Sequence, residues 1–451
     1  MSLAIAEQVR GRERTAVEVL DEHLEKLAAD ELGAVWLVTE KRARREAAAV
    51  DRALAEGRDP GPLAGVPVGW KDLIDTGGIR TTYGSALFRD HVPERDADVV
   101  ARFVAAGAVC VAKLATHELA WGTTSQNPHY GSCKNPHDPS RVPGGSSGGS
   151  AVALATGIVA AAPGTDTGGS IRCPASCCGV VGLKPTFGRV SLAGIRMLCP
   201  TLDHCGPMAR TVAECALQLE VLAGCSPRDP RTAPVPVERW SEAARRGVAG
   251  LTVGVAERYF FEHTAPDIAV QVRRGIDALR NAGARIVEVD MQWPRTLENG
   301  DPYTPEEAAT LWEFWPDRRA DLGPDVVRDL EAAEPMLAVE SAITSQHRLE
   351  YRARVHEALL AAGIDLVATP AQAFTPPKIG VTEVLFAGKQ SDVTVAMCRL
   401  TGIFNILGWP AISVPSGRDD AGMPVGLQLA SLPWQESYCL AAAAVVEAAS
   451  I

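Results

Sequence analysis

The sequence has no long hydrophobic run. Its longest apolar stretch, from Ala151 to Pro163, is interrupted by Thr156, whereas a membrane-spanning helix needs about 20 predominantly apolar residues. The start of the chain, through Arg10, contains charged side chains and lacks the basic start and apolar core of a secretory signal. We therefore expect a cytoplasmic protein with no membrane partner.

Basic residues are in the minority. Lysine and arginine together number 44, against 55 aspartate and glutamate residues, so the formal net charge is −11 and the isoelectric point lies near 5.4. Phosphate backbones and anionic lipids attract basic surfaces, which this balance does not provide. The composition therefore argues against nucleic acid as a partner.

Paired metal-ligating motifs are also missing. The 11 cysteines include no Cys-x-x-Cys pair, and the 9 histidines are scattered along the chain. Structural zinc sites and redox-active dithiols use such pairs, so we expect no metal, no cofactor and no catalytic thiol. In a reducing compartment the cysteines are expected to pack as small buried hydrophobic side chains.

The composition is that of a globular enzyme-sized chain. Its 451 residues are 46% hydrophobic and 22% charged, which permits a large buried core. Helical patterns over 98–106, 268–282 and 352–362 are each followed by a short apolar strand, over 107–113, 284–290 and 364–370. This alternation predicts an α/β fold with a parallel or mixed sheet and helical layers.

The chain is expected to form one large domain, because motifs that must meet in one site extend over most of its length. Within it, residues 1–60 are predicted to be helical, with a capping box at Thr15–Glu18, and 61–230 to form the core. A composition shift over 294–388, with Trp312 and Phe314 among charged residues, indicates a lid or substrate-facing insertion. The alternative is a peripheral helical layer whose aromatic side chains belong to the core.

Three short segments carry chemistry. Lys71 ends an apolar strand, and a buried lysine loses affinity for its proton and can act as a base. Residues 142–151 read Val-Pro-Gly-Gly-Ser-Ser-Gly-Gly-Ser-Ala, a glycine-rich loop without the lysine of a nucleotide-binding P-loop. Residues 164–174 place small residues directly before Ser170, so that backbone N–H groups can converge on one oxyanion.

A serine hydrolase needs a base and a nucleophile. Neither serine segment contains histidine, and Ser170, within Gly-Gly-Ser-Ile-Arg, does not stand in a Gly-x-Ser-x-Gly elbow. Lysine and a second serine remain as the proton carriers.

Together these segments resemble the amidase signature family. Lys71, Ser146 with Ser147, and Ser170 stand where that family carries its Ser-cisSer-Lys triad, and the separation 170 − 146 = 24 residues matches the family spacing. The resemblance continues through ordered landmarks at 135–138, 141–143, 182–186, 205–210, 408–415 and 422–428. It implies a central mixed β-sheet covered by helices on both faces.

The resemblance also implies a role for each residue. Ser170 would be the nucleophile, Ser146, after a cis peptide bond with Gly145, would relay the proton, and neutral Lys71 would be the base. Ser147 is the less favoured relay. The backbone amides of Thr167, Gly168 and Gly169 would form the oxyanion hole with that of Ser170, while Asp166 and Arg172 would brace the loop. Cys173, Cys177 and Cys178 would pack near the site without reacting.

The expected function is hydrolysis of amide bonds, other than peptide bonds, in a small molecule through an acyl-enzyme. Ester and carbamate (urethane) cleavage follow closely because these carbonyls differ mainly in the leaving group. An alternative is the glutaminase component, the A subunit, of a tRNA-dependent amidotransferase, in which the resemblance implies an acidic residue seven positions before Asn405; Cys398 stands there. A non-catalytic scaffold is disfavoured because all three triad positions are filled. The resemblance also allows a homodimer.

Overall fold

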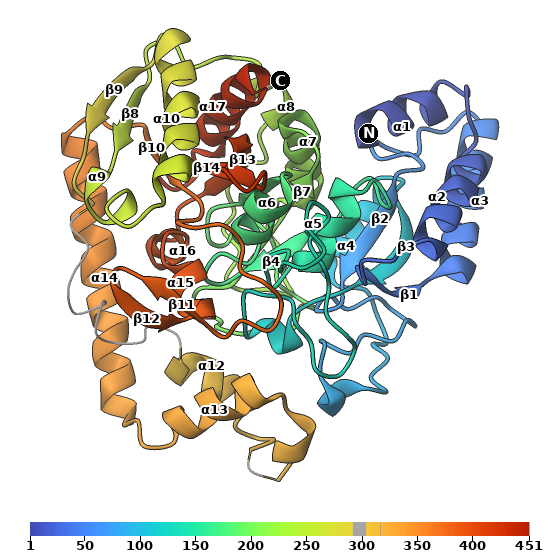
Figure 1. Ribbon diagram of the computed structural model, residues 1–451. Coiled ribbons are helices and arrows are strands. Elements are labelled where there is room, and N and C mark those ends of the chain that lie inside the picture. Colours follow the sequence, from blue (N-terminus) through green and yellow to red (C-terminus); the bar gives the residue numbers. More distant parts are fainter. Residues whose placement is uncertain (292–303, 316, 451) are drawn as a thin grey trace.

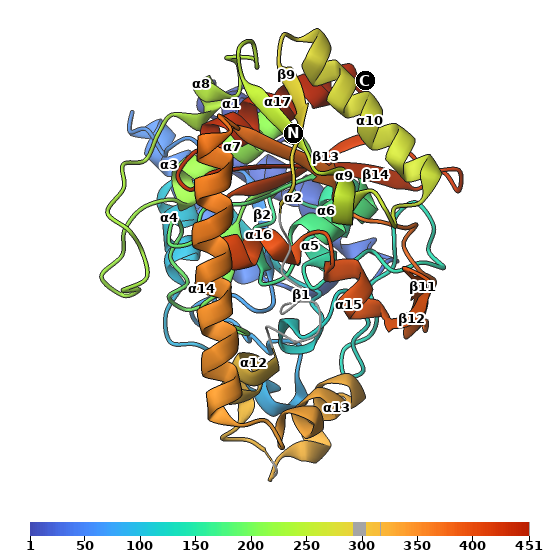
Figure 2. The same ribbon diagram turned by 90° about the vertical axis from the view of Figure 1, so that its left-hand side faces the viewer.

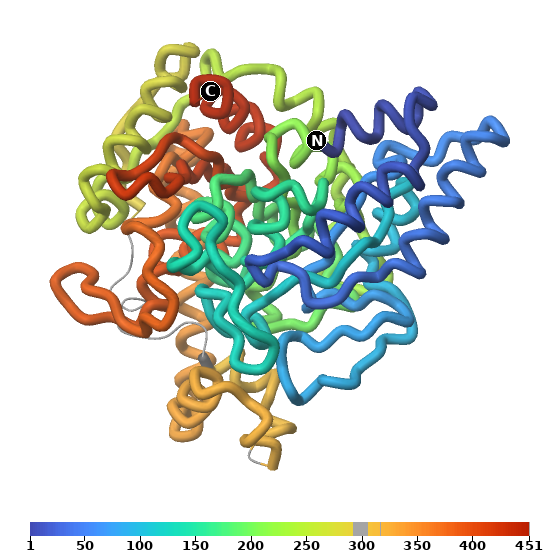
Figure 3. Tube along the Cα trace, turned by 45° about the vertical axis from the view of Figure 1, so that its right-hand side comes forward, coloured from blue at the N-terminus to red at the C-terminus, as the bar shows by residue number. Residues whose placement is uncertain are grey.

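A small sheet flanked by helices forms the N-terminal side of the molecule. The computed structural model describes residues 1–291, 304–315 and 317–450. Helices α1 (Ser2–Arg10), α2 (Ala16–Ala28) and α3 (Glu40–Ala55) lie together, in blue in Figure 3. They pack beside a three-stranded sheet of order β1 (Val35–Val38), β3 (Val109–Leu114) and β2 (Pro67–Lys71), in which β2 runs parallel to β3.

The larger sheet has seven strands and is mixed. Its order is β7 (Met208–Ala209), β5 (Val181–Lys184), β13 (Ala411–Arg418), β14 (Pro424–Ser431), β10 (Leu366–Pro370), β8 (Thr252–Val255) and β9 (Arg285–Glu288). The β13–β14 hairpin is antiparallel, whereas β8 runs parallel to both β9 and β10. All residues of β14 are buried, as expected for a central strand with both faces covered.

Helices cover both faces of this sheet. Helices α10 (Pro266–Asn281) and α17 (Glu436–Ala449) lie on one face, and α6 (Arg172–Cys178) lies on the other (Figure 2). Helix α5 (Gly148–Ala155) contacts β2, β3 and α6, and so joins the two sheets. The predicted single α/β domain with helices on both faces is therefore confirmed.

The remaining elements connect these layers. They are η1 (Ala86–Phe88), α4 (Asp98–Ala105), η2 (Glu118–Ala120), β4 (Gly164–Asp166), β6 (His204–Gly206), α7 (Val212–Leu222), α8 (Trp240–Ala243), α9 (Glu257–Phe260), α12 (Thr304–Leu311), η3 (Arg319–Asp321), α13 (Pro324–Ala333), α14 (Ala338–Ala361), β11 (Glu383–Phe386), β12 (Lys389–Asp392), α15 (Val393–Cys398) and α16 (Gly402–Leu407). Strands β4 and β6 form an antiparallel ribbon, and β11 pairs with β12.

The local predictions agree with the structure better than the long-range ones. Helices and strands occur at the predicted places with one exception: residues 1–60, predicted to be helical, also contain strand β1, whose apolar residues pair with β3. The predicted capping box is present, with Glu18 N donating to the Thr15 hydroxyl at 3.1 Å and Thr15 N donating to the Glu18 carboxylate at 2.8 Å. The strand predicted over 107–113 corresponds to β3, which lies in the small sheet rather than the large one. Periodicity identifies a strand but carries no information about its partners.

The range 294–388 contains more than one kind of structure. Residues 294–303 and 316 lie outside the described residues. Helices α12 and α13 lie at the end of the molecule opposite α10 and α17, and the 24-residue helix α14 runs along one side from them toward the large sheet (Figure 2). The same range includes β10, an interior strand of the large sheet.

Within the described residues, no helix is long and apolar enough to cross a membrane. Nine of the 11 cysteines are buried, the exceptions being the exposed Cys225 and the partly exposed Cys398. The prediction that cysteines serve mainly as packing residues is therefore confirmed for most of them.

Candidate active site

The three predicted segments meet between the two sheets. Lys71 is the last residue of β2, Ser146 and Ser147 precede α5, and Ser170 lies in the turn from β4 to α6. Figure 1 shows β2, β4, α5 and α6 side by side in the middle of the molecule. The N–H of Ser147 donates to the carbonyl of Ser170 at 3.2 Å, which ties the second segment directly to the third.

Lys71 occupies a dry environment. Its side chain is fully buried, and Nζ lies 2.7 Å from Ser146 Oγ and 2.7 Å from Thr165 Oγ1. Burial lowers the pKa of Lys71 to about 7, against the opposing effect of negative charge on Asp166 and Asp203. A large share of this amine is therefore neutral at neutral pH and able to accept a proton.

Ser146 and Ser147 have different partners. The Ser147 hydroxyl donates to the carbonyl of Thr165 and accepts from the N–H of the same residue, both at 3.2 Å. Its hydrogen bonds therefore hold it to the backbone of β4. Ser146, which follows a cis peptide bond from Gly145 as predicted, is the serine that contacts Lys71.

The segment that carries Ser170 is a glycine turn that requires glycine at one position. Gly169 has φ = 143°, and a Cβ there would lie 2.1 Å from Thr401 Oγ1. The Thr401 hydroxyl donates to the carbonyl of Gly168 at 2.6 Å. Because C=O and N–H point in opposite directions in a trans peptide, this contact directs the Gly169 N–H away from Thr401.

Backbone donors in this turn are free. Among the described residues, none accepts a hydrogen bond from the N–H groups of Thr167, Gly168, Gly169 or Ser170. Unpaired backbone donors in a buried segment are uncommon. Consecutive free N–H groups beside a buried serine suit an oxyanion.

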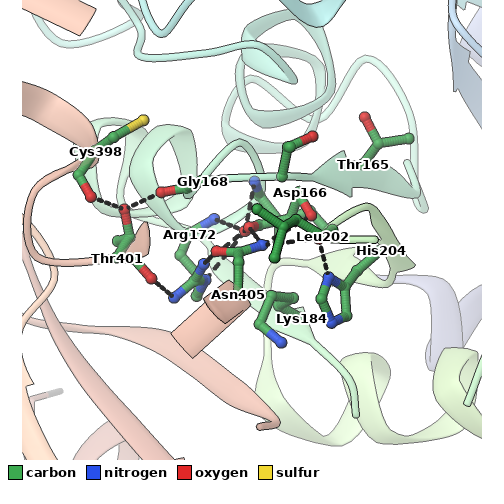
Figure 4. A network of polar contacts seen from close by, with 12 residues as sticks. Thr165, Asp166, Gly168, Arg172, Lys184, Leu202, His204, Cys398, Thr401 and Asn405 are labelled. Atoms are coloured by element: carbon green, nitrogen blue, oxygen red, sulfur yellow. Dashed lines mark hydrogen bonds and ion pairs between the residues drawn. The ribbon is translucent and has the colours of Figure 1, made fainter. Parts of the chain in front are cut away.

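Asp166 and Arg172 form a buried ion pair that braces the turn (Figure 4). Arg172 Nη2 and Nε donate to the two oxygens of Asp166 at 2.8 and 3.0 Å, and Nη1 donates to the carbonyl of Thr401 and to Gln428 Oε1. Asn405 accepts from Arg172 and donates to Asp166 at 2.8 Å. Burial opposes ionisation of Asp166, but the charge and hydrogen bonds of Arg172 hold the pKa of this carboxyl well below its usual range. The predicted bracing position of both residues agrees with these contacts.

The cysteines near the turn carry no reactive thiolate. Cys173 and Cys177 lie in an apolar cluster with Val142, Val393 and Met397. Burial raises the pKa of the thiols of Cys173, Cys178 and Cys398. Neutral thiols are poor nucleophiles, so these three cysteines are poorly suited to attack a carbonyl.

Several polar residues of the site were not predicted. Thr165 contacts Lys71; Thr401, Asn405 and Gln428 hold Arg172; and Asp203 accepts from the Thr167 hydroxyl at 2.5 Å. Thr165 lies inside the third segment, directly before Asp166, and this position in the sequence could have identified it as a site residue. Asp203 lies two residues before the landmark at 205–210, but a lone carboxylate near a motif resembles a solvated loop residue.

Helix α13 docks on the loop beside Ser146. Asp325 Oδ2 lies 2.7 Å from His117 Nε2, and the Trp121 indole donates to Asp329 at 3.0 Å. The N–H of His117 donates to the carbonyl of Ser146 at 3.3 Å. Helix α13 therefore contacts His117 and Trp121, and His117 is in turn hydrogen-bonded to the backbone of Ser146.

Comparison with known proteins gives a consistent result. The family model described as Amidase matches residues 18–440. The A subunit of the glutamyl-tRNA(Gln) amidotransferase from Koribacter versatilis is 36% identical, over 97% of this chain and 96% of the relative. Among solved structures, one from a complex reported to reveal the evolutionary origins of an s-triazine catabolic enzyme is 33% identical, with a TM-score of 0.94 and 100% and 98% of the two chains covered. A bacterial aryl acylamidase of the amidase signature family is 26% identical, with a TM-score of 0.91 and 100% and 96% covered.

Proposed function

The chain belongs to the amidase family, and we propose that it hydrolyses a carbon–nitrogen bond, other than a peptide bond, of a small amide through an acyl-enzyme at Ser170. The observation that carries this proposal is the contact of Lys71 Nζ with Ser146 Oγ at 2.7 Å in a fully buried setting. A buried lysine with a pKa of about 7 supplies the base that histidine provides in other serine hydrolases.

The reaction proceeds in two halves. Ser170 Oγ attacks the substrate carbonyl while its proton passes to Ser146 and the Ser146 proton passes to neutral Lys71. The N–H groups of Thr167, Gly168 and Gly169, with that of Ser170, hold the resulting oxyanion. Ser146 then delivers a proton to the leaving nitrogen and regains one from the Lys71 ammonium, while the C–N bond breaks and the amine departs. Water attacks the acyl-enzyme through the same relay and releases the acid and Ser170.

Asp166 and Arg172 act as positioning residues in this scheme. Asp166 Oδ2 accepts from the N–H of Ile171 at 3.1 Å, directly after the nucleophile, and Arg172 fixes that carboxylate. Both side chains are fully buried and mutually neutralised. The pair thus holds the shape of the turn.

The helical segment 304–361 is proposed as a lid. Its contacts with His117 and Trp121 bring α13 to the loop beside Ser146. The strand β10 belongs to the large sheet, so the proposal covers only the helical part of the predicted range.

A second candidate is the glutaminase role within a tRNA-dependent amidotransferase, which would place the chain in a complex with partner proteins. Curated relatives that bear the name of its A subunit are 36% to 38% identical over more than nine-tenths of the chain. The similarity to these relatives supports the second candidate more directly than it supports a free-standing amidase. It supports either of these functions more than it supports a urethanase. Against it stands Cys398, whose thiol pKa is raised by burial and which therefore brings no negative charge to bind an ammonium group.

Labelling and activity assays of the purified protein distinguish these functions. Ser170→Ala should abolish both turnover and fluorophosphonate labelling, while Ser150→Ala, which changes a buried serine of the adjacent helix α5, should retain both. Anilides, primary amides, glutamine, aryl esters and aryl carbamates are then compared as substrates. Anilide turnover by the chain alone supports the first candidate. Glutamine hydrolysis that requires added partner proteins supports the second, and absence of labelling at Ser170 would indicate a non-catalytic scaffold.

A further inference from the structure

A small cavity adjoins the proposed proton relay. Its wall includes Thr165, Thr167, Asp203, His204 and Arg196, and its volume is about 10 Å³, so it holds at most one water molecule. Thr165 is the residue whose hydroxyl contacts Lys71 Nζ at 2.7 Å. Asp203 and Thr165 therefore line the same small cavity.

We propose that Asp203 is a positioning residue of the relay, which fixes Thr167 in the oxyanion turn and supplies an unpaired negative charge next to Lys71. This inference rests on the proposed function, because it assigns Asp203 a role in the chemistry at Ser170. Nothing in the proposed chemistry requires Asp203 to touch the substrate. Its effect is exerted through Thr167 and Lys71.

The contacts of Asp203 hold it in one orientation. Oδ1 accepts from the Thr167 hydroxyl at 2.5 Å, while Oδ2 accepts from the N–H groups of Leu198 and Cys199 at 2.8 and 3.1 Å. All three donors are neutral. The hydrogen bonds therefore fix the carboxylate without cancelling its charge. An arginine or lysine partner would neutralise that charge.

Asp203 differs in this respect from the other carboxylate near Lys71. Asp166 is neutralised by the bidentate Arg172, whereas no arginine, lysine or histidine within the described ranges forms an ion pair with Asp203. Burial raises the pKa of the Cys205 thiol to about 12, so this third neighbour of Lys71 is uncharged. Asp203 is thus the unneutralised negative charge beside the base.

Other charged groups also face Asp203. Glu306 of α12 raises the pKa of Asp203, although burial is the main cause of its rise to about 6. His204 is kept neutral because burial lowers its pKa well below the usual value. Arg196 in the cavity wall stacks over Phe88 and donates to the carbonyl of Thr310. Because its pKa is about 6, Asp203 is mainly ionised above about pH 6, and this includes the pH range near 7 in which Lys71 titrates.

The charge has a predictable effect on pH dependence. A negative charge stabilises the ammonium form of Lys71, so its removal lowers the pKa of the base. The base must be neutral to act, and the acidic limb of the rate profile therefore moves to lower pH without Asp203. We expect a move of about one pH unit, the lower end of the effect of an opposite charge close to a buried group.

The test is the pH dependence of fluorophosphonate labelling at Ser170, which needs no knowledge of the substrate. Asp203→Asn removes the charge and keeps the shape, and should shift the acidic limb to lower pH. Thr167→Val replaces the hydroxyl that positions the turn with a methyl group, and should slow labelling at every pH. Asp98→Asn, a buried carboxylate held by Ser191 and Arg228, is the control for loss of a remote charge and should leave the limb in place.

The outcomes separate the two proposals. If wild-type protein is not labelled at Ser170, the proposed function fails before Asp203 is tested. If wild-type protein is labelled and Asp203→Asn leaves the limb unmoved, the role of Asp203 is refuted even where the rate falls. Should Asp203→Asn not yield folded protein, Asp203→Ser removes the same charge with a smaller side chain, and the same shift is required.

Discussion

Replacement of Lys71 by methionine is the sharpest test of the proposed relay. Methionine fills the buried volume of the lysine stem but has no proton acceptor. The contribution of a positioned general base is about a hundred- to ten-thousandfold, so kcat/KM at pH 7 should fall by that factor. The residual rate should rise about tenfold per pH unit, because hydroxide then replaces the base.

The pH dependence of the wild-type rate also follows from the titration of Lys71. With a pKa of about 7 for Lys71, about half of the enzyme holds the neutral base at pH 7 and about a tenth at pH 6. The rate should therefore fall about fivefold between these two pH values. Lys71→Met should lose this inflection, since the base whose deprotonation produces it is absent.

A stability measurement gives an independent check. The pKa of Lys71 is depressed in the folded protein from an ordinary value of 10.5 to about 7, so between these values the unfolded chain binds more protons than the folded one. The unfolding free energy should therefore rise with pH, by about 1.4 kcal/mol per pH unit, relative to that of Lys71→Met. The rise in unfolding free energy begins near pH 7 and ends near pH 10.5, the ordinary pKa of lysine.

Lys113→Met is the matched control. Lys113 is also buried, and it is held by the carbonyl of Ile74 and by the hydroxyls of Thr76 and Thr81. Its replacement should destabilise the protein but leave the acidic limb of the rate profile in place. Near-normal kcat/KM of Lys71→Met at pH 7 would refute the relay, as would a limb that persists in that variant.

Further variants test the surrounding geometry. Ser146→Ala should reduce kcat by at least about a hundredfold because it interrupts the relay, whereas Ser147→Ala should cost far less activity; equal losses in the two rates would contradict the assignment. Gly169→Ala should lower both kcat and thermal stability, since its φ of 143° is costly for any residue with a Cβ, by about 1–3 kcal/mol, and normal melting and activity would show that the turn tolerates a side chain. Arg172→Met leaves Asp166 buried and unpaired, and denaturant unfolding should report a loss of about 3–5 kcal/mol; a neutral effect would show that the ion pair does not brace the turn.

Only part of the hydrogen-bond network around Arg172 could be predicted from the sequence. Its ion pair with Asp166 spans six residues and was accessible from the motif, but its other partners Thr401, Asn405 and Gln428 lie more than 200 residues further along the chain. They reach Arg172 because α16 and β14 pack against α6 and the nucleophile turn. No local pattern encodes that packing, which depends on how the strands of the large sheet are ordered.

Lys71 and Lys113 show why a local pattern could not separate a base from a structural residue. Lys71 is the last residue of the apolar strand β2, Lys113 is the last but one of the apolar strand β3, and both are buried. In the parallel pair β2–β3, however, Lys71 stands opposite Leu114 and Lys113 opposite Trp70. Neighbouring positions on a strand face opposite sides of a sheet, so this offset of one residue sends the two amines to different faces.

The partners on those faces decide what each amine can do. Lys113 contacts the hydroxyls of Thr76 and Thr81 as well, but it also donates to the carbonyl of Ile74 and lies 3.5 Å from the carboxylate of Asp72. A carbonyl oxygen only accepts and a neighbouring carboxylate favours the ammonium form, so these two partners favour the charged amine. The contacts of Lys71 are the hydroxyls of Ser146 and Thr165, and a hydroxyl can both donate and accept. The Lys71–Ser146 contact can therefore persist while the proton moves in either direction, as acylation and deacylation require in turn. The register of two strands thus separates the proposed base from a lysine with the same local sequence pattern.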